Sequence, residues 1–173
     1  MTTTSTPKIY VGTYAKYNNG NLFGKWLDLA DYSSAEEFYN ASKELHSDED
    51  DPELMFQDWE NDPGNFISES SINIGVWEYL NNINGMSEDE IIAYGEYISE
   101  MGNDPSDIED FKESWNGKWD SEISFAENLV DDCYDLEKTM GNLSSYFDYE
   151  KFARDLFISD YWYSETGNVF RRF

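Results

Sequence analysis

The feature that most constrains this chain is a central stretch, residues 44–111, that contains 20 Asp and Glu residues and no Lys or Arg. The flanking segments differ, because residues 1–43 carry four acids and four bases and residues 112–173 carry 13 acids and seven bases. The formal charge of the whole chain is −26 over 173 residues. Twenty carboxylates without counter-charge repel one another, so a fold has to hold them on an outer surface.

Aromatic residues decide whether so charged a chain folds. The composition lies close to that of disordered acidic proteins, yet the chain contains 6 Trp, 13 Tyr and 11 Phe. Each of these side chains can bury roughly 150–250 Å², and we interpret them as a packed core rather than as a sugar-stacking platform. No apolar run approaches the roughly 20 residues that span a bilayer, and the opening MTTTSTPK lacks the apolar region of a secretory signal. We therefore expect a cytoplasmic protein without membrane contact.

Composition disfavours several classes of site chemistry. One cysteine, Cys133, and one histidine, His46, cannot form an internal disulfide or a Cys/His zinc cluster. Cys133 falls on an apolar helical phase, where we expect a buried, inert thiol rather than the partner of His46 in a protease dyad. Nucleic acid binding requires clustered Lys and Arg, and the charge balance here has the opposite sign.

The motifs of common enzymes are also missing. The chain has no G-x-S-x-G, no H-E-x-x-H, no P-loop and no G-x-G-x-x-G turn. Residues 48–54 (DEDDPEL) place Glu53 where an EF-hand loop requires glycine. Among 37 carboxylates, a pair at glycosidase spacing arises by chance and carries no information. We expect no enzyme activity, no metal and no cofactor.

Residues 1–61 predict a small α+β unit. Asn19-Gly20 favours a tight hairpin turn between two segments rich in β-branched and aromatic residues. Overlapping capping-box patterns at Ser33 and Ser34 predict a helix that runs to about residue 45. The predicted strands of the antiparallel sheet are 8–15, 21–29 and 53–60.

Residues 62–112 predict an acidic helical unit. A second helix of this unit begins at Ser87, with Glu90 in the capping-box position, and ends at Gly102. A third begins at Asp104-Pro105. At about 100° per residue, the acidic and apolar side chains of both helices, with Trp115 on the apolar side, fall on opposite faces. The first helix is predicted from about residue 68 by a stripe of Ile72, Val76, Leu80 and Ile83.

Residues 113–173 predict a second α+β unit. A long helix over 122–140 ends at Gly141, and another helix follows Asp148. The last strands, 158–163 and 168–173, form a hairpin. The predicted fold class is therefore α+β, an elongated chain of three small units: a three-stranded antiparallel sheet plus helix, an acidic helical bundle, and helices plus a C-terminal β-hairpin.

The acidic field of the central stretch needs an explanation of its own. Interspersed lysines would give solubility without the repulsion between like charges at i,i+4. A strong anionic field is complementary to a basic groove, and deep basic grooves belong to proteins that hold nucleic acid. At one charge per roughly 1.7 Å of duplex, a charge of −26 corresponds to about 44 Å of DNA. The residues favour a duplex mimic, with an acidic interaction module for another basic or nucleic-acid-binding partner as the alternative.

Three blocks of sequence carry a family resemblance. The segment IYVGTYAKYNNGNLFGKWLDL resembles the N-terminus of the ArdA-type antirestriction proteins, in which Tyr, Asn-x-Gly and Gly-x-Trp recur in this arrangement. The segment DDPELMFQDWEN is similar to the acidic motif of that family, and YFDYEKFARDLFISDYWYSETGNVFRRF is similar to its ending. The blocks occur in the expected order and cover nearly the whole chain.

The resemblance implies a non-enzymatic inhibitor carried by mobile elements. Such an inhibitor mimics bent B-form DNA and occupies the DNA groove formed by the specificity and modification subunits of type I restriction–modification enzymes. The resemblance also implies a homodimer formed through the C-terminal unit. The candidate phosphate-mimicking residues, from the family's acidic motif and the outer faces of the central helices, are Asp51, Glu53, Asp58, Glu60, Asp62, Glu88, Asp89, Glu96, Glu100, Asp107, Asp110 and Glu113.

Overall fold

The computed structural model of the chain describes residues 6–102, 104–105 and 108–173. It confirms the α+β class, and the chain separates into two compact units, one ending at Ile108 and the other beginning at Glu109. The predicted division into three units, with boundaries after residues 61 and 112, stays a prediction.

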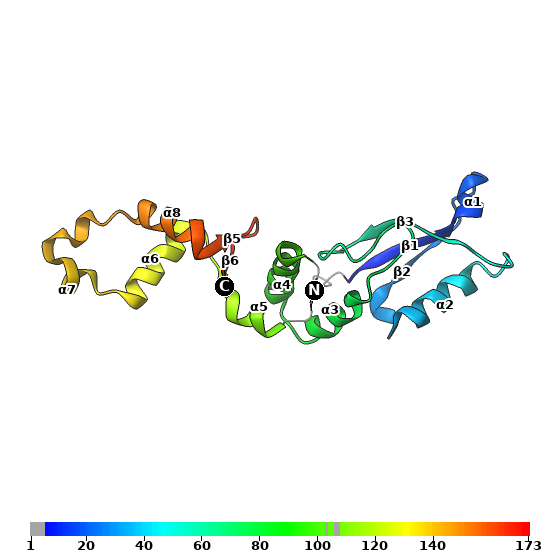
Figure 1. Cartoon of the computed structure of the whole chain (residues 1–173), viewed down its shortest axis with the longest axis horizontal. Coiled ribbons are helices and arrows are strands. Elements are labelled where there is room, and N and C mark those ends of the chain that lie inside the picture. The colour runs from blue at the N-terminus through cyan, green and yellow to red at the C-terminus, as the bar shows by residue number, and fades with distance from the viewer. Residues whose placement is uncertain (1–5, 103, 106–107) are drawn as a thin grey trace. The chain divides into compact units, whose positions relative to one another are not determined.

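A three-stranded antiparallel sheet opens the first unit (Figure 1). Ile9 and Val11 are fully buried on its inner face, and the alternate residues Lys8 and Tyr10 point to the other side and remain partly exposed. The sheet confirms the three predicted strands. They are β1 (Lys8–Thr13), β2 (Lys25–Asp28) and β3 (Leu54–Glu60), in the order β2-β1-β3.

The connection between β1 and β2 differs from the predicted tight turn. A short helix, α1 (Tyr14–Asn18), follows β1 directly, and the hydroxyl of Thr13 caps it by accepting from the N–H of Lys16. Gly20 has a φ of +75°, but it lies in the exit from α1 and not in a two-residue hairpin. The Asn-Gly pair marks a positive φ, which a helix exit uses as well as a hairpin turn does.

Helix α2 (Ala35–Leu45) covers the inner face of the sheet (Figure 1). It follows a 3-10 turn, η1 (Leu29–Asp31), and begins as predicted: the Ser34 hydroxyl accepts from the N–H of Glu37, whose carboxylate accepts from Ser33. Phe38 of α2 is fully buried and its ring lies 5.9 Å from that of Phe56 in β3. These aromatic contacts support the interpretation of the aromatic residues as core.

Two helices complete the first unit. The helix predicted from residue 68 begins only at α3 (Gly75–Ile83), because Ile72 instead pairs with Ile67 in an isolated β-bridge. Helix α4 (Glu88–Met101) has the predicted bounds, with a capping box at Ser87 and Glu90 and a left-handed Gly102 at its end. The rings of Tyr79 and Tyr94 stack between α3 and α4 at 5.6 Å.

Helix α5 (Ile108–Ser114) and strand β4 (Trp115–Lys118) lead into the second unit. Residues 106–107 lie outside the described residues, so the predicted start of this helix at Asp104-Pro105 is not described in full. Trp115 belongs to β4 and not to the helix, because the helix ends one residue earlier. No pattern predicted β4, which is short and contains Asn116 and Gly117.

The second sheet confirms the predicted C-terminal hairpin and adds β4 beside it. Strands β5 (Tyr161–Tyr163) and β6 (Asn168–Arg171) pair antiparallel, and the sheet order is β4-β6-β5. Gly167 in the hairpin turn has a φ of +94°. Val169 and Phe170 of β6 are fully buried, and the ring of Trp162 stacks on that of Phe170 at 4.1 Å.

The long helix predicted over 122–140 is wrong. Helix α6 (Glu122–Cys133) stops where Tyr134 turns to extended backbone, and Asp135 then caps a separate short helix through the N–H of Lys138. Cys133, expected to be buried, is exposed because it is the last residue of α6. The remaining elements are α7 (Leu136–Met140), the 3-10 segment η2 (Gly141–Tyr146) and α8 (Tyr149–Ser159), which Asp148 caps as predicted.

Candidate functional site

Four predicted contacts lie on or just before β3. Asp58 and Glu60 are exposed near the end of this edge strand, where they lie opposite Tyr10 and Lys8 of β1. Asp51 and Glu53 are exposed in the segment that joins α2 to β3. The carbonyl of Glu53 accepts a hydrogen bond of 3.0 Å from the N–H of Tyr14, which ties this segment to α1. The four carboxylates therefore project from a hydrogen-bonded framework.

Helix α4 carries the clearest acidic stripe. Asp89 and Glu100 are exposed and Glu96 is half-buried, while the broad opposite face buries Tyr94 and Ile98. This arrangement confirms that acidic and apolar side chains occupy opposite faces of the helix. Met101, predicted on the apolar face, is 61% exposed because it is the final residue of α4. Glu88 is also exposed, in the first turn.

Asp62 has a different environment from the other predicted contacts. Its two carboxylate oxygens accept hydrogen bonds of 2.9 Å from the backbone N–H groups of Phe66 and Ile67. Burial raises the pKa of Asp62 above its ordinary value, although the two hydrogen bonds oppose the rise. Its oxygens thus organise the turn between β3 and α3, and they are not presented outward.

The remaining predicted contacts belong to α5. Asp110 and Glu113 are exposed on this helix, whereas Asp107 lies outside the described residues. Lys112 pairs with Glu109 at 2.7 Å, so this helix carries a counter-charge that α4 lacks. Exposed pairs of this kind contribute little to stability.

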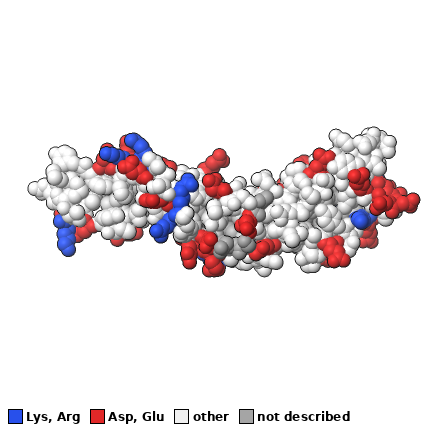
Figure 2. All heavy atoms as spheres, in the orientation of Figure 1, with Lys and Arg blue, Asp and Glu red and all other residues white. Residues whose placement is uncertain are grey.

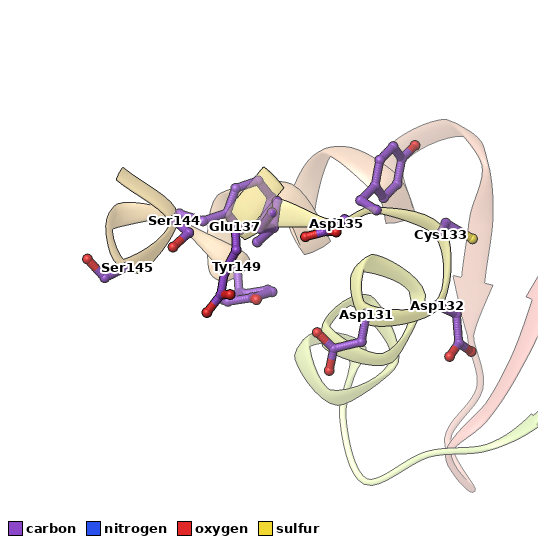
Figure 3. Close-up of a pocket in the computed structure, with 11 residues that line it drawn as sticks. Asp131, Asp132, Cys133, Asp135, Glu137, Ser144, Ser145 and Tyr149 are labelled. Carbon is purple, nitrogen blue, oxygen red and sulfur yellow. The ribbon is translucent and has the colours of Figure 1, made fainter. Parts of the chain in front are cut away.

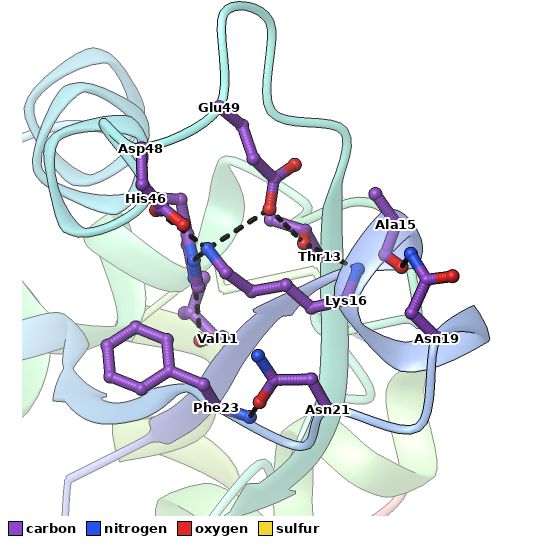
Figure 4. A network of polar contacts seen from close by, with 10 residues as sticks. All are labelled: Val11, Thr13, Ala15, Lys16, Asn19, Asn21, Phe23, His46, Asp48 and Glu49. Carbon is purple, nitrogen blue, oxygen red and sulfur yellow. Dashed lines mark hydrogen bonds and ion pairs between the residues drawn. The ribbon is translucent and has the colours of Figure 1, made fainter.

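A polar cluster around the buried His46, which sequence patterns did not reveal, anchors the end of α2 (Figure 4). The ammonium of Lys16 lies 2.8 Å from Oδ1 of Asp48 and 3.0 Å from Oε1 of Glu49. It also lies 3.0 Å from Nδ1 of the fully buried His46, whose Nε2 is 3.1 Å from the Val11 carbonyl. A carbonyl only accepts, so Nε2 carries the proton and Nδ1 accepts from Lys16.

This cluster removes His46 from reactive chemistry. Both ring nitrogens are engaged inside the unit, so the imidazole has no lone pair to activate a thiol. The hydrogen bond from Lys16 lowers the pKa of Asp48, and hydrogen bonds from Thr13 and then Lys16 lower that of Glu49. Burial lowers the pKa of Lys16, but its bonds to these two carboxylates raise it above the ordinary value.

Acidic side chains are distributed over the visible surface of the first unit, whereas Lys and Arg gather mainly on the second (Figure 2). Ion pairs of the described residues include those of Lys16 with Asp48 and Glu49 and that of Lys112 with Glu109. The described residues hold no group of three or more His, Cys, Asp or Glu arranged to bind a metal ion. None of the described helices is long and apolar enough to cross a membrane.

An open hollow of about 930 Å³ lies in the second unit, between the end of α6 and the α7–η2 segment (Figure 3). Carboxylates dominate its polar lining, among them Asp131, Asp132 and Asp135. Cys133 lies at its edge. Such a lining repels anionic ligands, and no base is placed to activate the thiol among the residues that line it.

Comparison with known proteins adds a family assignment to this geometry. Residues 9–170 match the model of the family described as Antirestriction protein (ArdA), a match that spans nearly the whole chain. No curated protein matches the chain.

Proposed function

The chain belongs to the ArdA antirestriction protein family, and from this premise we propose that it is a non-enzymatic DNA mimic. Its acidic surface occupies the DNA groove formed by the specificity and modification subunits of a type I restriction–modification enzyme. Inhibition is then competitive occupation, with no covalent step and no cofactor. The protein binds the enzyme and not nucleic acid.

One observation carries this proposal: acids of the central stretch are held outward on regular structure, in a stretch that contains no Lys or Arg. Asp58 and Glu60 project from β3, and Asp89 and Glu100 from α4. Residues 44–111 contain 20 acids and no Lys or Arg, and Lys16, which lies outside this stretch, pairs with Asp48 and Glu49. Like charges on one surface cost stability, so a binding role accounts for a pattern that solubility alone does not.

The spacing along α4 also suits a phosphate mimic. At a rise of about 1.5 Å per residue, Glu96 and Glu100 are separated by about 6 Å along the axis, and Asp89 and Glu96 by about 10 Å. Phosphates on one DNA strand advance about 3.4 Å per step, so these separations correspond to about two and three steps. A groove lined by Arg and Lys at phosphate spacing would therefore meet carboxylates at matching positions.

The proposed oligomer is a homodimer formed through the second unit. Large apolar side chains are exposed on the second unit, which supports a face that a second subunit covers. The most exposed of them are Tyr134, Leu143, Tyr146, Ile158 and Phe173, from 58% to 81%.

The decisive experiment titrates this protein into a complex of a purified type I methyltransferase with labelled duplex DNA. The mimic displaces the DNA, and its apparent affinity falls steeply as salt is raised. A triple variant of α4, Asp89→Asn, Glu96→Gln and Glu100→Gln, weakens displacement. The matched control removes three exposed acids from the second unit, Glu127→Gln, Asp131→Asn and Asp155→Asn, and competes like the parent. No displacement by the parent protein would refute the proposal.

The alternative is an acidic module for another basic or nucleic-acid-binding partner. The same excess of exposed acid supports it, because the negative charge of this protein requires a positively charged partner but does not identify that partner. Under this alternative the bound partner is not released by duplex DNA, whereas a type I enzyme is.

A further inference from the structure

The outer face of the first sheet presents two cross-strand rows of different chemistry. Tyr10 of β1 lies between Trp26 of β2 and Asp58 of β3. Across the three strands, this row therefore consists of two aromatic side chains followed by a carboxylate. In the neighbouring row Lys8 lies between Asp28 and Glu60. Directly opposite residues of antiparallel strands have Cβ atoms about 4.5–5.5 Å apart. Tyr10 and Asp58 are therefore direct neighbours on this face of the sheet.

The aromatic half of the first row is held in place. The rings of Tyr10 and Trp26 meet edge to face with centroids 5.6 Å apart. The hydroxyl of Tyr10 donates a hydrogen bond of 3.0 Å to the Leu22 carbonyl, which fixes the tilt of its ring. Trp26 is nevertheless 39% exposed, although Trp is among the side chains that gain most from burial. Helix α2 covers the opposite face of the sheet and not this one.

The carboxylate of the first row is also held in place, and its hydrogen bonds differ from those of Asp28 in the neighbouring row. Oδ1 of Asp58 accepts a hydrogen bond of 2.9 Å from the N–H of Trp59, which orients an exposed carboxylate beside Tyr10. Asp28 is engaged instead, because its oxygens accept from the Thr6 hydroxyl and from the N–H of Ala30. Lys8 supplies a cation in the row of Asp28 and Glu60. The row of Asp58 contains no cation, so it is the anionic row with an aromatic surface.

We propose that Trp26, Tyr10 and Asp58 form a binding site for an arginine side chain of a basic partner protein, with the guanidinium stacked on the aromatic pair and hydrogen-bonded to Asp58. A guanidinium is planar, stacks on aromatic faces and donates to carboxylates in a fixed fork, whereas an ammonium is a compact, strongly hydrated charge. A phosphate is repelled by Asp58 and by the surrounding acids. The site deepens the proposed function, on which it rests for the identity of the partner as a DNA-binding enzyme.

The inference adds a specific contact to a binding mode that is otherwise distributed over many carboxylates. Aromatic and arginine side chains are the residues that most often dominate interface energies. The outer sheet face then supplies selectivity for Arg, while the acids of α4 supply charge.

The first test measures the binding of hexa-arginine and hexa-lysine to the full-length protein by calorimetry. Both peptides bind the acidic surface, and hexa-arginine binds more tightly. Trp26→Leu and Asp58→Asn each reduce the preference for arginine by about two- to fivefold. Tyr146→Leu, which removes an 81% exposed aromatic from the second unit, leaves the preference unchanged. Far-UV circular dichroism confirms folding, and Asp58→Asn serves as the independent variant because it leaves the sheet core intact.

The second test uses displacement of labelled DNA from a type I methyltransferase and separates the two proposals. Trp26→Leu weakens displacement at low and at high salt alike, because stacking is less screened than exposed charge. An unchanged arginine preference and unchanged displacement in both Trp26→Leu and Asp58→Asn would overturn the arginine site while leaving the proposed function standing. Failure of the parent protein to displace DNA, with the arginine preference present and lost in Trp26→Leu, would instead refute the proposed function alone.

Discussion

The ammonium of Lys16 and the imidazole of His46, thirty residues apart in sequence, meet at 3.0 Å and join α1 to the end of α2. The contact orients Lys16 toward Asp48 and Glu49, so one cation serves three acceptors. The side chain of Lys16 is only 11% exposed, and the ring of Phe23 covers it at 5.3 Å. Lys16 is therefore the cation that holds the acidic segment after α2 to α1.

Replacing Lys16 should destabilise the first unit. Lys16→Met removes the donor to three acceptors and leaves two neighbouring carboxylates without their counter-charge, at a cost of about 1–3 kcal/mol. The free energy of unfolding from urea denaturation at pH 7 measures the effect. Lys43→Met, which removes an exposed lysine from the last turn of α2, is the control and costs much less. Equal losses in the two variants would mean that the cluster contributes nothing beyond net charge.

The contribution of this cluster should also depend on pH in one direction. The folded pKa values of Asp48 and Glu49 lie below their ordinary values, so the unfolded state binds more protons as the pH falls. The stabilisation is present in full above about pH 5 and is lost as the pH falls through the lowered folded values. The difference in unfolding free energy between the parent and Lys16→Met therefore shrinks below about pH 4. A difference that stays constant down to pH 3 would contradict this assignment.

Local signals were the part of the fold that the sequence could predict. The cap at Ser87 and Glu90 and the stop at Gly102 involve residues within one turn, so α4 was predicted with its bounds and its two faces. The end of α6 at Cys133 could not be predicted in this way. The apolar spacing continues to Met140, and only the extended backbone of Tyr134 and the cap at Asp135 separate the two helices.

The same distinction between local and long-range signals applies to the candidate site. Exposure of the acids on α4 follows from helical period, whereas the engagement of Asp62 depends on the backbone N–H groups of Phe66 and Ile67 in a turn with no motif. The row of Trp26, Tyr10 and Asp58 depends on strand register, and the cluster of Lys16 and His46 on the placement of α1 beside the end of α2. Register brings together residues that lie far apart in sequence, so spacing alone does not reveal them.

Asp62 should behave as a structural residue and not as one of the proposed binding residues. Asp62→Asn replaces one accepting oxygen by an amide that faces a backbone donor, so one of its two hydrogen bonds is lost, at a cost of about 1–2 kcal/mol. Displacement of DNA from the methyltransferase stays unchanged, because this carboxylate is not presented outward. Urea denaturation and the displacement titration measure the two effects. A variant of parental stability that competes poorly would place Asp62 among the contacts.

The C-terminal hairpin should depend on Gly167 for steric as well as conformational reasons. A Cβ there would lie 2.7 Å from the carbonyl oxygen of Trp119, and its φ of +94° is unfavourable for other residues. Gly117 of the same unit has a φ of +83° but no neighbour closer than 3.9 Å. Gly117→Ala therefore costs about 1–2 kcal/mol, and Gly167→Ala costs clearly more. Thermal unfolding of the two variants makes the comparison, and equal shifts would remove the steric argument.

Charge reversal at the two ends of α4 should separate binding from stability. Glu100 lies near the helix C-terminus and four residues after Glu96, so Glu100→Lys relieves repulsion and complements the helix dipole, a gain of about 0.5 kcal/mol. Glu88 lies in the first turn, where a negative charge is favourable, so Glu88→Lys lowers stability by a similar amount. Both changes weaken displacement of DNA if α4 faces the cationic groove. Thermal unfolding at low salt together with the displacement titration measures both quantities, and a Glu100→Lys variant that is more stable and competes like the parent would exclude α4 from the contact surface.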